Sequence, residues 1–236
     1  MITKENLSKL LEQTQEIAKE VGAFIRKERQ HFDVEKVEHK GFNDLVSYVD
    51  KEAERQIVEK LSAIFPESGF ITEEGTSTTK GEKYNWVIDP LDGTTNFIHG
   101  IPVFSVSIAL MEEEKVIMGV VYEVNRHECF YAMKGGGAFC NDTPIKVSKA
   151  PDLSASLIST GFPYYNFDLI DRYLNSMKSL MQKTHGLRRF GSAAVDLCYV
   201  ASGRTEGFFE YNLNSYDVAA GAVIVQEAGG KVTDFA

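Results

Sequence analysis

The residues best suited to chemistry lie between positions 86 and 97, which read Trp-Val-Ile-Asp-Pro-Leu-Asp-Gly-Thr-Thr-Asn-Phe. An apolar strand is expected to deliver Asp89 at its end, because Pro90 fixes its own φ and holds the preceding residue extended. Asp92 follows closely, and two neighbouring carboxylates are costly unless something neutralises them. Hard oxygen ligands without His or Cys beside them suit Mg²⁺ rather than zinc. The segment therefore predicts a magnesium site, with a simple turn as the alternative.

The next three residues, Gly93, Thr94 and Thr95, extend this motif. Glycine permits a tight backbone, and the two threonines could open a helical turn whose free N–H groups suit an anion. The net charge of the chain is −9, from 25 basic and 34 acidic residues. An acidic protein that handles an anionic substrate usually needs a metal ion between the two, and Mg²⁺ at this motif would offer phosphate that cation.

Two further acidic positions could complete the site. Glu73-Glu74 follows a short buried strand, so a neighbouring strand end could place Glu73 beside Asp89. A solvated turn is the alternative, and we prefer it for Glu74. Asp217 begins an apolar helix, where an Asp is most often an N-cap. A cap residue can also bind a metal, because its side chain points away from the start of the helix.

The elements that must position these residues follow from the apolar pattern. The first thirty residues predict a helix, because apolar residues recur at three- and four-residue steps. A second helix fits Asp50 to Phe65 and stops at Pro66. Strands are expected next, the last three forming an antiparallel meander with helices against it: Gly69 to Thr72, Trp86 to Asp89, Val103 to Leu110, Val116 to Tyr122 and Glu128 to Met133.

From about Val147 the pattern changes to alternating strands and helices, which predicts a second α/β unit. The expected strands are Ser156 to Thr160, Gly207 to Tyr211 and Lys231 to Thr233. The expected helices are Phe167 to Gln182, Ser192 to Ala201 and Asp217 to Ala228. We therefore divide the chain into an α+β domain, residues 1–147, with the meander and the main metal motif, and an α/β domain, residues 148–236, that supplies Asp217 and substrate contacts. A cleft between them is the default ligand site.

The composition excludes several classes of protein. The chain has 236 residues, 43% of them hydrophobic and 25% charged, which is typical of a globular protein and not of a disordered or coiled-coil one. No window reaches the roughly 18 apolar residues of a membrane span, and no apolar signal run starts the chain. Three cysteines without CxxC spacing predict no zinc or disulfide framework and a reducing cytoplasm. The net acidity argues against direct binding of nucleic acid.

Several of these motifs together resemble the inositol monophosphatase family. They are the segment 86–97, Glu73-Glu74 before it, and Tyr216-Asp217-Val218-Ala219-Ala220-Gly221, with further matches at 44–50, 137–141, 191–194 and 227–230. The resemblance covers nearly the whole chain. It implies a mixed α+β and α/β fold, built as a layered α-β-α-β-α sandwich, and a homodimer. It also implies a Mg²⁺-dependent, lithium-sensitive phosphatase of the superfamily that includes fructose-1,6-bisphosphatase.

The resemblance also implies a role for each site residue. Two to three Mg²⁺ ions per subunit are expected: one on Glu73, Asp89 and the carbonyl of Leu91, a second on Asp89, Asp92 and Asp217, and a third on Glu73 and mainly water. The implied catalytic residues are Glu73, Thr94 and Asp50, the last of which orients Thr94 or the attacking water. The implied contacts to phosphate and substrate hydroxyls are Asp92, Gly93, Thr94, Thr95, Ala193, Glu210 and Asp217.

The activity that the resemblance implies is that of a phosphoric monoester hydrolase. The expected substrate is a small phosphorylated polyol, first of all myo-inositol monophosphate. Fructose bisphosphate, 3′-phosphoadenosine 5′-phosphate, NADP and histidinol phosphate are the alternatives within the same chemistry. A protein that binds the transcription machinery is the alternative from another class. We interpret His99 as a loop or packing residue, and His185 with Arg188-Arg189 as a solvated turn or dimer contact.

Overall fold

The computed structural model describes residues 2–32, 38–41, 44–163 and 166–234. Its helices are α1 (Lys4–Gln30), α2 (Tyr48–Ile64), α3 (Thr94–His99), η2 (Leu153–Ala155, a 3₁₀ turn), α4 (Ile170–Met181), α5 (Ala193–Ala201) and α6 (Ser215–Glu227). Its strands are β1 (Glu38–Gly41), β2 (Asp44–Val46), β3 (Gly69–Thr72), β4 (Tyr84–Asp92), β5 (Ser105–Glu112), β6 (Lys115–Glu123), β7 (Glu128–Met133), β8 (Gly137–Cys140), β9 (Thr143–Ile145), β10 (Leu157–Thr160), β11 (Gly186–Arg188) and β12 (Gly207–Phe209).

The central element is a seven-stranded sheet in the order β3-β4-β5-β6-β7-β8-β9. All neighbours pair antiparallel except β3 and β4, which are parallel. The predicted meander is therefore confirmed. The strand that was expected to end at Asp89 continues to Asp92, and its register against β5 shifts between these two residues. The shift falls at Pro90, which has no N–H to donate to the neighbouring strand.

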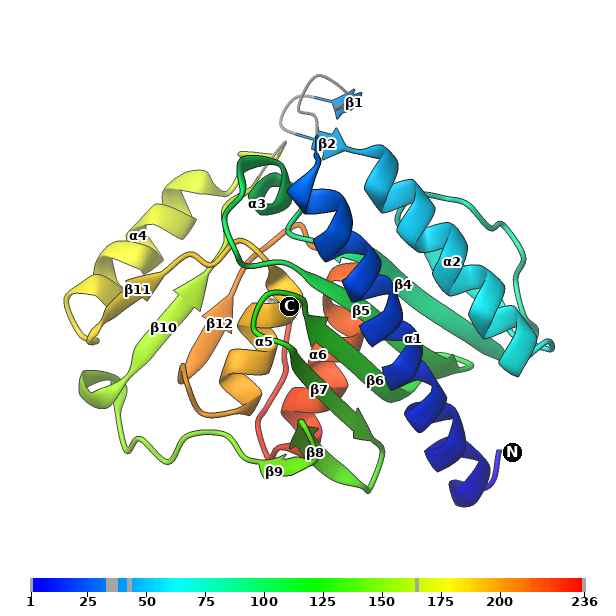
Figure 1. Ribbon diagram of the computed structural model, residues 1–236. Coiled ribbons are helices and arrows are strands. Elements are labelled where there is room, and N and C mark those ends of the chain that lie inside the picture. Colours follow the sequence, from blue (N-terminus) through cyan, green and yellow to red (C-terminus); the bar gives the residue numbers. More distant parts are fainter. Residues whose placement is uncertain (1, 33–37, 42–43, 164–165, 235–236) are drawn as a thin grey trace.

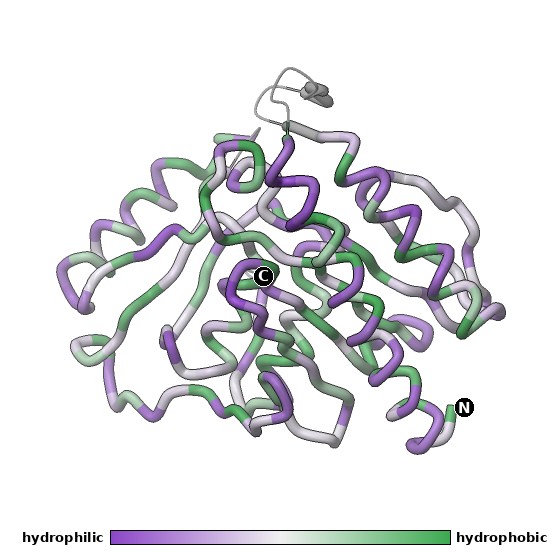
Figure 2. Tube along the Cα trace, in the orientation of Figure 1, coloured by the Kyte–Doolittle hydropathy of each residue, from purple (hydrophilic) through white to green (hydrophobic). Residues whose placement is uncertain are grey.

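Helices α1 and α2 cover one face of this sheet (Figure 1). The apolar stripe of α1 buries Val21 and Ile25 completely, while its other face is hydrophilic (Figure 2). Helix α2 begins at Tyr48, slightly before the predicted start, because Ser47 caps it. The Ser47 hydroxyl accepts the N–H of Val49 at 3.1 Å, and Asp50 accepts the N–H of Ser47 at 2.9 Å. Asp50 therefore lies in the first turn of an anchored helix.

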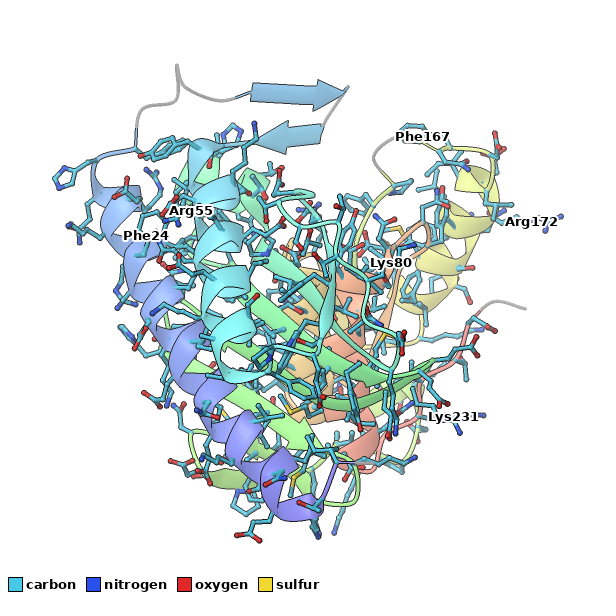
Figure 3. The ribbon with its side chains drawn as sticks, turned by 90° about the vertical axis from the view of Figure 1, so that its right-hand side faces the viewer. Phe24, Arg55, Lys80, Phe167, Arg172 and Lys231 are labelled. Carbon is cyan, nitrogen blue, oxygen red and sulfur yellow. The ribbon has the colours of Figure 1, made fainter. Side chains whose placement is uncertain are left out.

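Helices α5 and α6 cover the opposite face of the large sheet. A second sheet of three parallel strands, in the order β11-β10-β12, lies beyond them. Helix α4 packs on the far side of this small sheet (Figures 1 and 3), where Figure 3 labels Arg172. The layers therefore alternate as helices, large sheet, helices, small sheet and helix, and the predicted sandwich is confirmed.

Two predictions for the C-terminal part are wrong. Residues Lys231 to Thr233 form no strand, because they lie exposed on the surface and are not held against a sheet edge (Lys231 is labelled in Figure 3). Asp217 is not the N-cap of its helix, because α6 begins at Ser215 behind the cap residue Asn214. The division of the chain at residues 147 and 148 stays a prediction.

The described ranges contain no helix with both the length and the apolar character that a membrane crossing requires. Cys129, Cys140 and Cys198 are free thiols, and the first and last of them are buried. Cys129 lies in the core and packs as a small hydrophobic side chain, and burial raises its pKa to about 12.

The position of α6 depends on a glycine in β6. A side-chain carbon at Gly119 would lie 2.8 Å from both the Cα atom and the carbonyl oxygen of Ala220 on α6. Backbone atoms cannot rotate aside as the end of a side chain can, so glycine is needed for this close contact. Because α6 carries Asp217 in its first turn, the same contact helps to set where that carboxylate lies.

We expect Gly119→Ala to lower the free energy of unfolding by about 1–3 kcal/mol, the usual cost of overpacking a core. Gly207→Ala on β12 is the matched control, because a carbon there meets the end of the Ile158 side chain at 3.3 Å and no backbone atom within 4 Å. Chemical denaturation of both variants measures the difference. Equal stability of the two would show that α6 does not depend on this contact.

Candidate functional site

An acidic cavity of about 280 Å³ lies where the ends of β3 and β4 meet the starts of α3, α5 and α6. Ten of the eleven predicted site residues line it: Glu73, Asp89, Leu91, Asp92, Gly93, Thr94, Thr95, Ala193, Glu210 and Asp217. The eleventh, Asp50, is buried behind Thr94. The structure therefore brings these residues to one place, while their roles in binding stay predictions.

Asp89 is surrounded by the other acidic residues of the cavity. It is 2% exposed, and Glu73, Asp92 and Asp217 are its electrostatic neighbours. Glu73 lies near it because β3 and β4 are parallel neighbours, and the Glu73 N–H donates to the Ile88 carbonyl at 3.3 Å. This geometry agrees with the expectation that two neighbouring strand ends bring Glu73 beside Asp89.

Asp92 joins the end of β4 to the start of α5. Its Oδ2 atom accepts the Ser192 hydroxyl at 2.5 Å and the Ala194 N–H at 2.7 Å, and Oδ1 accepts the Ala193 N–H at 3.3 Å. A carboxylate at the start of a helix is stabilised by free N–H groups and by the helix dipole. Asp92 therefore has a structural role as well as its place in the cavity.

Asp50 fixes the side chain of Thr94 by a hydrogen bond. The Thr94 hydroxyl lies 2.9 Å from Asp50 Oδ1 and 3.0 Å from the Leu91 carbonyl oxygen, and both oxygens can accept a hydrogen bond from it. Asp50 is 1% exposed, and its Oδ2 atom accepts the hydroxyl of Ser47 at 2.5 Å. The rotamer of Thr94 is therefore fixed from the first turn of α2. Gly93 precedes it with φ of 97°, a left-handed conformation that favours glycine.

Asp217 reaches the cavity from the first turn of α6. Its Oδ2 atom accepts the N–H of Asn214 at 2.5 Å, so the side chain turns back over the start of the helix. A cap side chain that points away from the start of the helix was expected. Asp217 instead lies within the first turn and folds back, and it still lines the cavity. The neighbouring Tyr216 also lines the cavity.

Two charged residues of the cavity were missed or misjudged. Asp196 on α5 is 1% exposed and lines the cavity, although no motif drew attention to it. A lone Asp within the apolar run of α5 was the available signal. Arg189 was interpreted as part of a solvated turn or dimer contact, but it lines the cavity, with its guanidinium 5.7 Å from the centre of the Phe162 ring. His99 and His185 are exposed.

The carboxyl groups of the cavity resist ionisation in the metal-free protein. Burial raises the pKa of Asp89 well above its usual range, and the charges of Glu73 and Asp92 raise it further. Burial raises the pKa of Asp92 to about 6, although hydrogen bonds from Ser192 and Ala194 lower it. Burial also raises the pKa of Asp217 to about 7. A cation in the cavity would relieve this cost.

The donor chemistry of the cavity fits Mg²⁺. The described lining residues include carboxylate, carbonyl and hydroxyl oxygens but no His or Cys, which is the donor set of a hard cation. Within the described part of the chain, no three His, Cys, Asp or Glu side chains already form a ready-made metal cluster. The cavity therefore has suitable donors, and the assignment of individual ligands stays a prediction.

Comparison with known proteins agrees with this geometry. A sequence model described as the inositol monophosphatase family matches residues 6–236. A putative Nus factor SuhB of Neisseria meningitidis serogroup B is 44% identical over 218 residues, which are 92% of this chain and 84% of that protein.

Solved structures show the same fold. The extragenic suppressor protein suhB of Bartonella henselae superposes with a TM-score of 0.91 and 41% identity, covering 96% of this chain and 87% of that one. An IMPase of Thermotoga maritima gives a TM-score of 0.87 and 38% identity, covering 96% and 86%.

The pKa shifts predict how the stability of the metal-free protein depends on pH. Burial raises the pKa of Glu210 from 4.5 to about 8, so the folded state binds this proton more tightly than the unfolded state. That contribution to stability is complete below about pH 4.5 and is lost as the pH rises through about 8. We expect the melting temperature in EDTA to fall over this window, and Glu210→Gln to reduce the fall because an amide does not titrate. Calorimetry at several pH values measures both proteins, and an equally steep fall in the variant would contradict the assignment.

Proposed function

Because the chain belongs to the inositol monophosphatase family, we propose that it hydrolyses the phosphate monoester of a small polyol with Mg²⁺ as cofactor. The first candidate substrate is myo-inositol monophosphate. The observation that carries the proposal is the gathering of Glu73, Asp89, Asp92 and Asp217 around one cavity that also contains the turn of Gly93 and Thr94. Lithium sensitivity, a homodimer and a cytoplasmic location belong to the same proposal.

Overlapping sets of these residues would hold the metal ions. Glu73, Asp89 and the Leu91 carbonyl would hold one ion, and Asp89, Asp92 and Asp217 a second, while a third ion would use Glu73 and mainly water. When bound, these ions would acidify water and neutralise charge on the phosphate. Electrostatic stabilisation of this kind is needed because hydrolysis of phosphate monoesters is among the slowest uncatalysed reactions.

The remaining residues would position water and phosphate. Thr94, whose hydroxyl is fixed by Asp50, would orient the attacking water, with Glu73 beside it. The N–H groups of Gly93, Thr94 and Thr95 would donate to phosphate oxygens that gain charge in the transition state. The chain would thus orient the water and the phosphate. Its acidic side chains would contact the phosphate only through the metal ions.

The substrate hydroxyls would contact Ala193, Glu210 and Asp217. These residues line the cavity together with Asp92. A volume of about 280 Å³ lies just below the usual range for ligand pockets and favours a small polyol over a nucleotide.

A second candidate function is an association with the transcription machinery. The name of the Neisseria meningitidis relative, putative Nus factor SuhB, favours it. The net charge of −9 argues that such an association would use protein contacts more than direct contact with RNA. This role would not require turnover, so the two functions can be tested separately.

We expect Asp92→Asn to lower the rate of phosphate release by at least about 100-fold, while the protein stays folded. The fold should survive because the amide oxygen can still accept from Ser192 and Ala194 as Oδ2 does. Phosphate release is measured with and without Mg²⁺ on a panel of inositol, fructose, adenosine, NADP and histidinol phosphates, with a melting curve as control. Wild-type activity of the variant at saturating Mg²⁺ would exclude the two-metal assignment.

We expect the same Asp92→Asn variant to bind RNA polymerase as the wild-type protein does, if the second function is present. A pull-down with polymerase from the source cell measures this binding. No capture of polymerase by either protein would remove the second candidate and leave the hydrolase proposal standing.

A further inference from the structure

Glu54 is a buried acid on α2 that touches the site only indirectly. It has no exposed surface, and it lies four residues after Asp50 on the same helix. We propose that Glu54 is a positioning residue, which fixes the segment containing Glu73 so that this segment can bind metal. The inference rests on the proposed function and assigns a part of it to a residue outside the cavity.

Three hydrogen bonds join Glu54 to this segment. Its Oε2 atom accepts the N–H of Glu74 at 2.7 Å, and its Oε1 atom accepts both the N–H and the hydroxyl of Thr76 at 2.8 Å. All three donors lie just after Glu73 in the chain. Hydrogen bonds to a carboxylate are shorter and stronger than those between neutral groups. One buried side chain therefore fixes both the path and the orientation of the backbone after Glu73.

The segment needs this support because strand pairing ends before it. Strand β3 ends at Thr72, and Gly75 and Thr76 are exposed. The Glu73 N–H still reaches the Ile88 carbonyl, but at the long distance of 3.3 Å. Beyond that point, Glu54 accepts the backbone N–H groups of Glu74 and Thr76. Ordering an exposed segment costs conformational entropy, and an anchored one binds a metal without that cost.

The same face of α2 holds the other half of the site. Asp50 fixes Thr94 at the end of β4, and Glu54, about one helical turn later, fixes the segment at the end of β3. A single capped helix thus sets the spacing between two site segments. The next residue, Arg55, is instead exposed and pairs with Glu52 and Glu59 on the outer face of α2 (Figure 3).

The test is direct titration of Mg²⁺ into the metal-free proteins, without substrate. Glu54→Gln replaces one carboxylate oxygen by an NH₂ group that opposes an N–H donor, so we expect Mg²⁺ affinity to fall by about 10-fold or more. The assay of activity should show a higher apparent KM for Mg²⁺ with a nearly unchanged kcat at saturation. Thr76→Val removes only the hydroxyl of an exposed residue, keeps the fold, and should give a smaller shift in the same direction.

Glu227→Gln is the matched control. Glu227 also accepts two backbone N–H groups, from Gly135 and Gly137 at 2.9 Å each, but it clamps a turn that does not line the cavity. We expect its Mg²⁺ affinity to equal that of the wild-type protein. Hydrogen exchange of residues 70–80 should rise in Glu54→Gln and not in Glu227→Gln.

The possible outcomes distinguish a failure of the inference about Glu54 from a failure of the proposed function. Weaker Mg²⁺ binding by Glu54→Gln, with unchanged binding by Glu227→Gln, supports the inference. Equal binding by Glu54→Gln and the wild-type protein overturns it alone, and so does an equal loss in both glutamine variants, which would reflect general destabilisation. Should Glu54→Gln fail to fold, unchanged Mg²⁺ affinity of Thr76→Val overturns the inference. A wild-type protein that binds no Mg²⁺ overturns the proposed function itself.

Discussion

The burial of several carboxylates around one cavity is the constraint on which the rest of the structure depends. Asp89, Asp92 and Asp217 all have raised pKa values, with burial as the main cause in each case. Unless they stay protonated, such groups can stay together only if the surrounding fold is stable without them or if a cation joins them. The apolar clusters on both faces of the large sheet meet the first condition. Bound Mg²⁺ is proposed to meet the second.

The fold limits the cost of this burial by giving the acidic residues structural partners. Asp92 accepts hydrogen bonds from the start of α5, and Asp217 accepts one at the start of α6. Asp50 and Glu54 on α2 likewise accept N–H and hydroxyl groups from the segments that they hold. The partners of each carboxylate are therefore parts of the backbone framework. If Asp92 and Asp217 bind metal as proposed, metal binding and folding should be coupled, since their oxygens also accept these hydrogen bonds.

The sequence could predict residues that belong to a local pattern. Asp89 and Asp92 follow an apolar strand and precede a turn, and Asp217 stands at the start of an apolar helix, so each carried its own signal. Asp196 carried only the signal of a lone Asp in an apolar helix, and nothing local showed that Arg189 lines the cavity, because both places depend on how distant segments pack around it. The expected strand from residue 231 failed for a related reason: β-propensity alone does not supply a neighbouring strand. The order of the layers came from the family resemblance and not from periodicity.

The intact cavity bears on how the two proposed functions relate. A protein that only bound other proteins through its surface would gain nothing from four acidic side chains directed into one cavity. Ionisation of the buried Asp89, Asp92 or Asp217 disfavours the metal-free fold, and replacing one of them by a neutral residue would relieve that cost. The chain nevertheless carries Glu73, Asp89, Asp92 and Asp217 together with the supporting Asp50. This cost has a physical reason if the cavity binds metal. A surface interaction with the transcription machinery would then be added to the hydrolase activity and would not replace it.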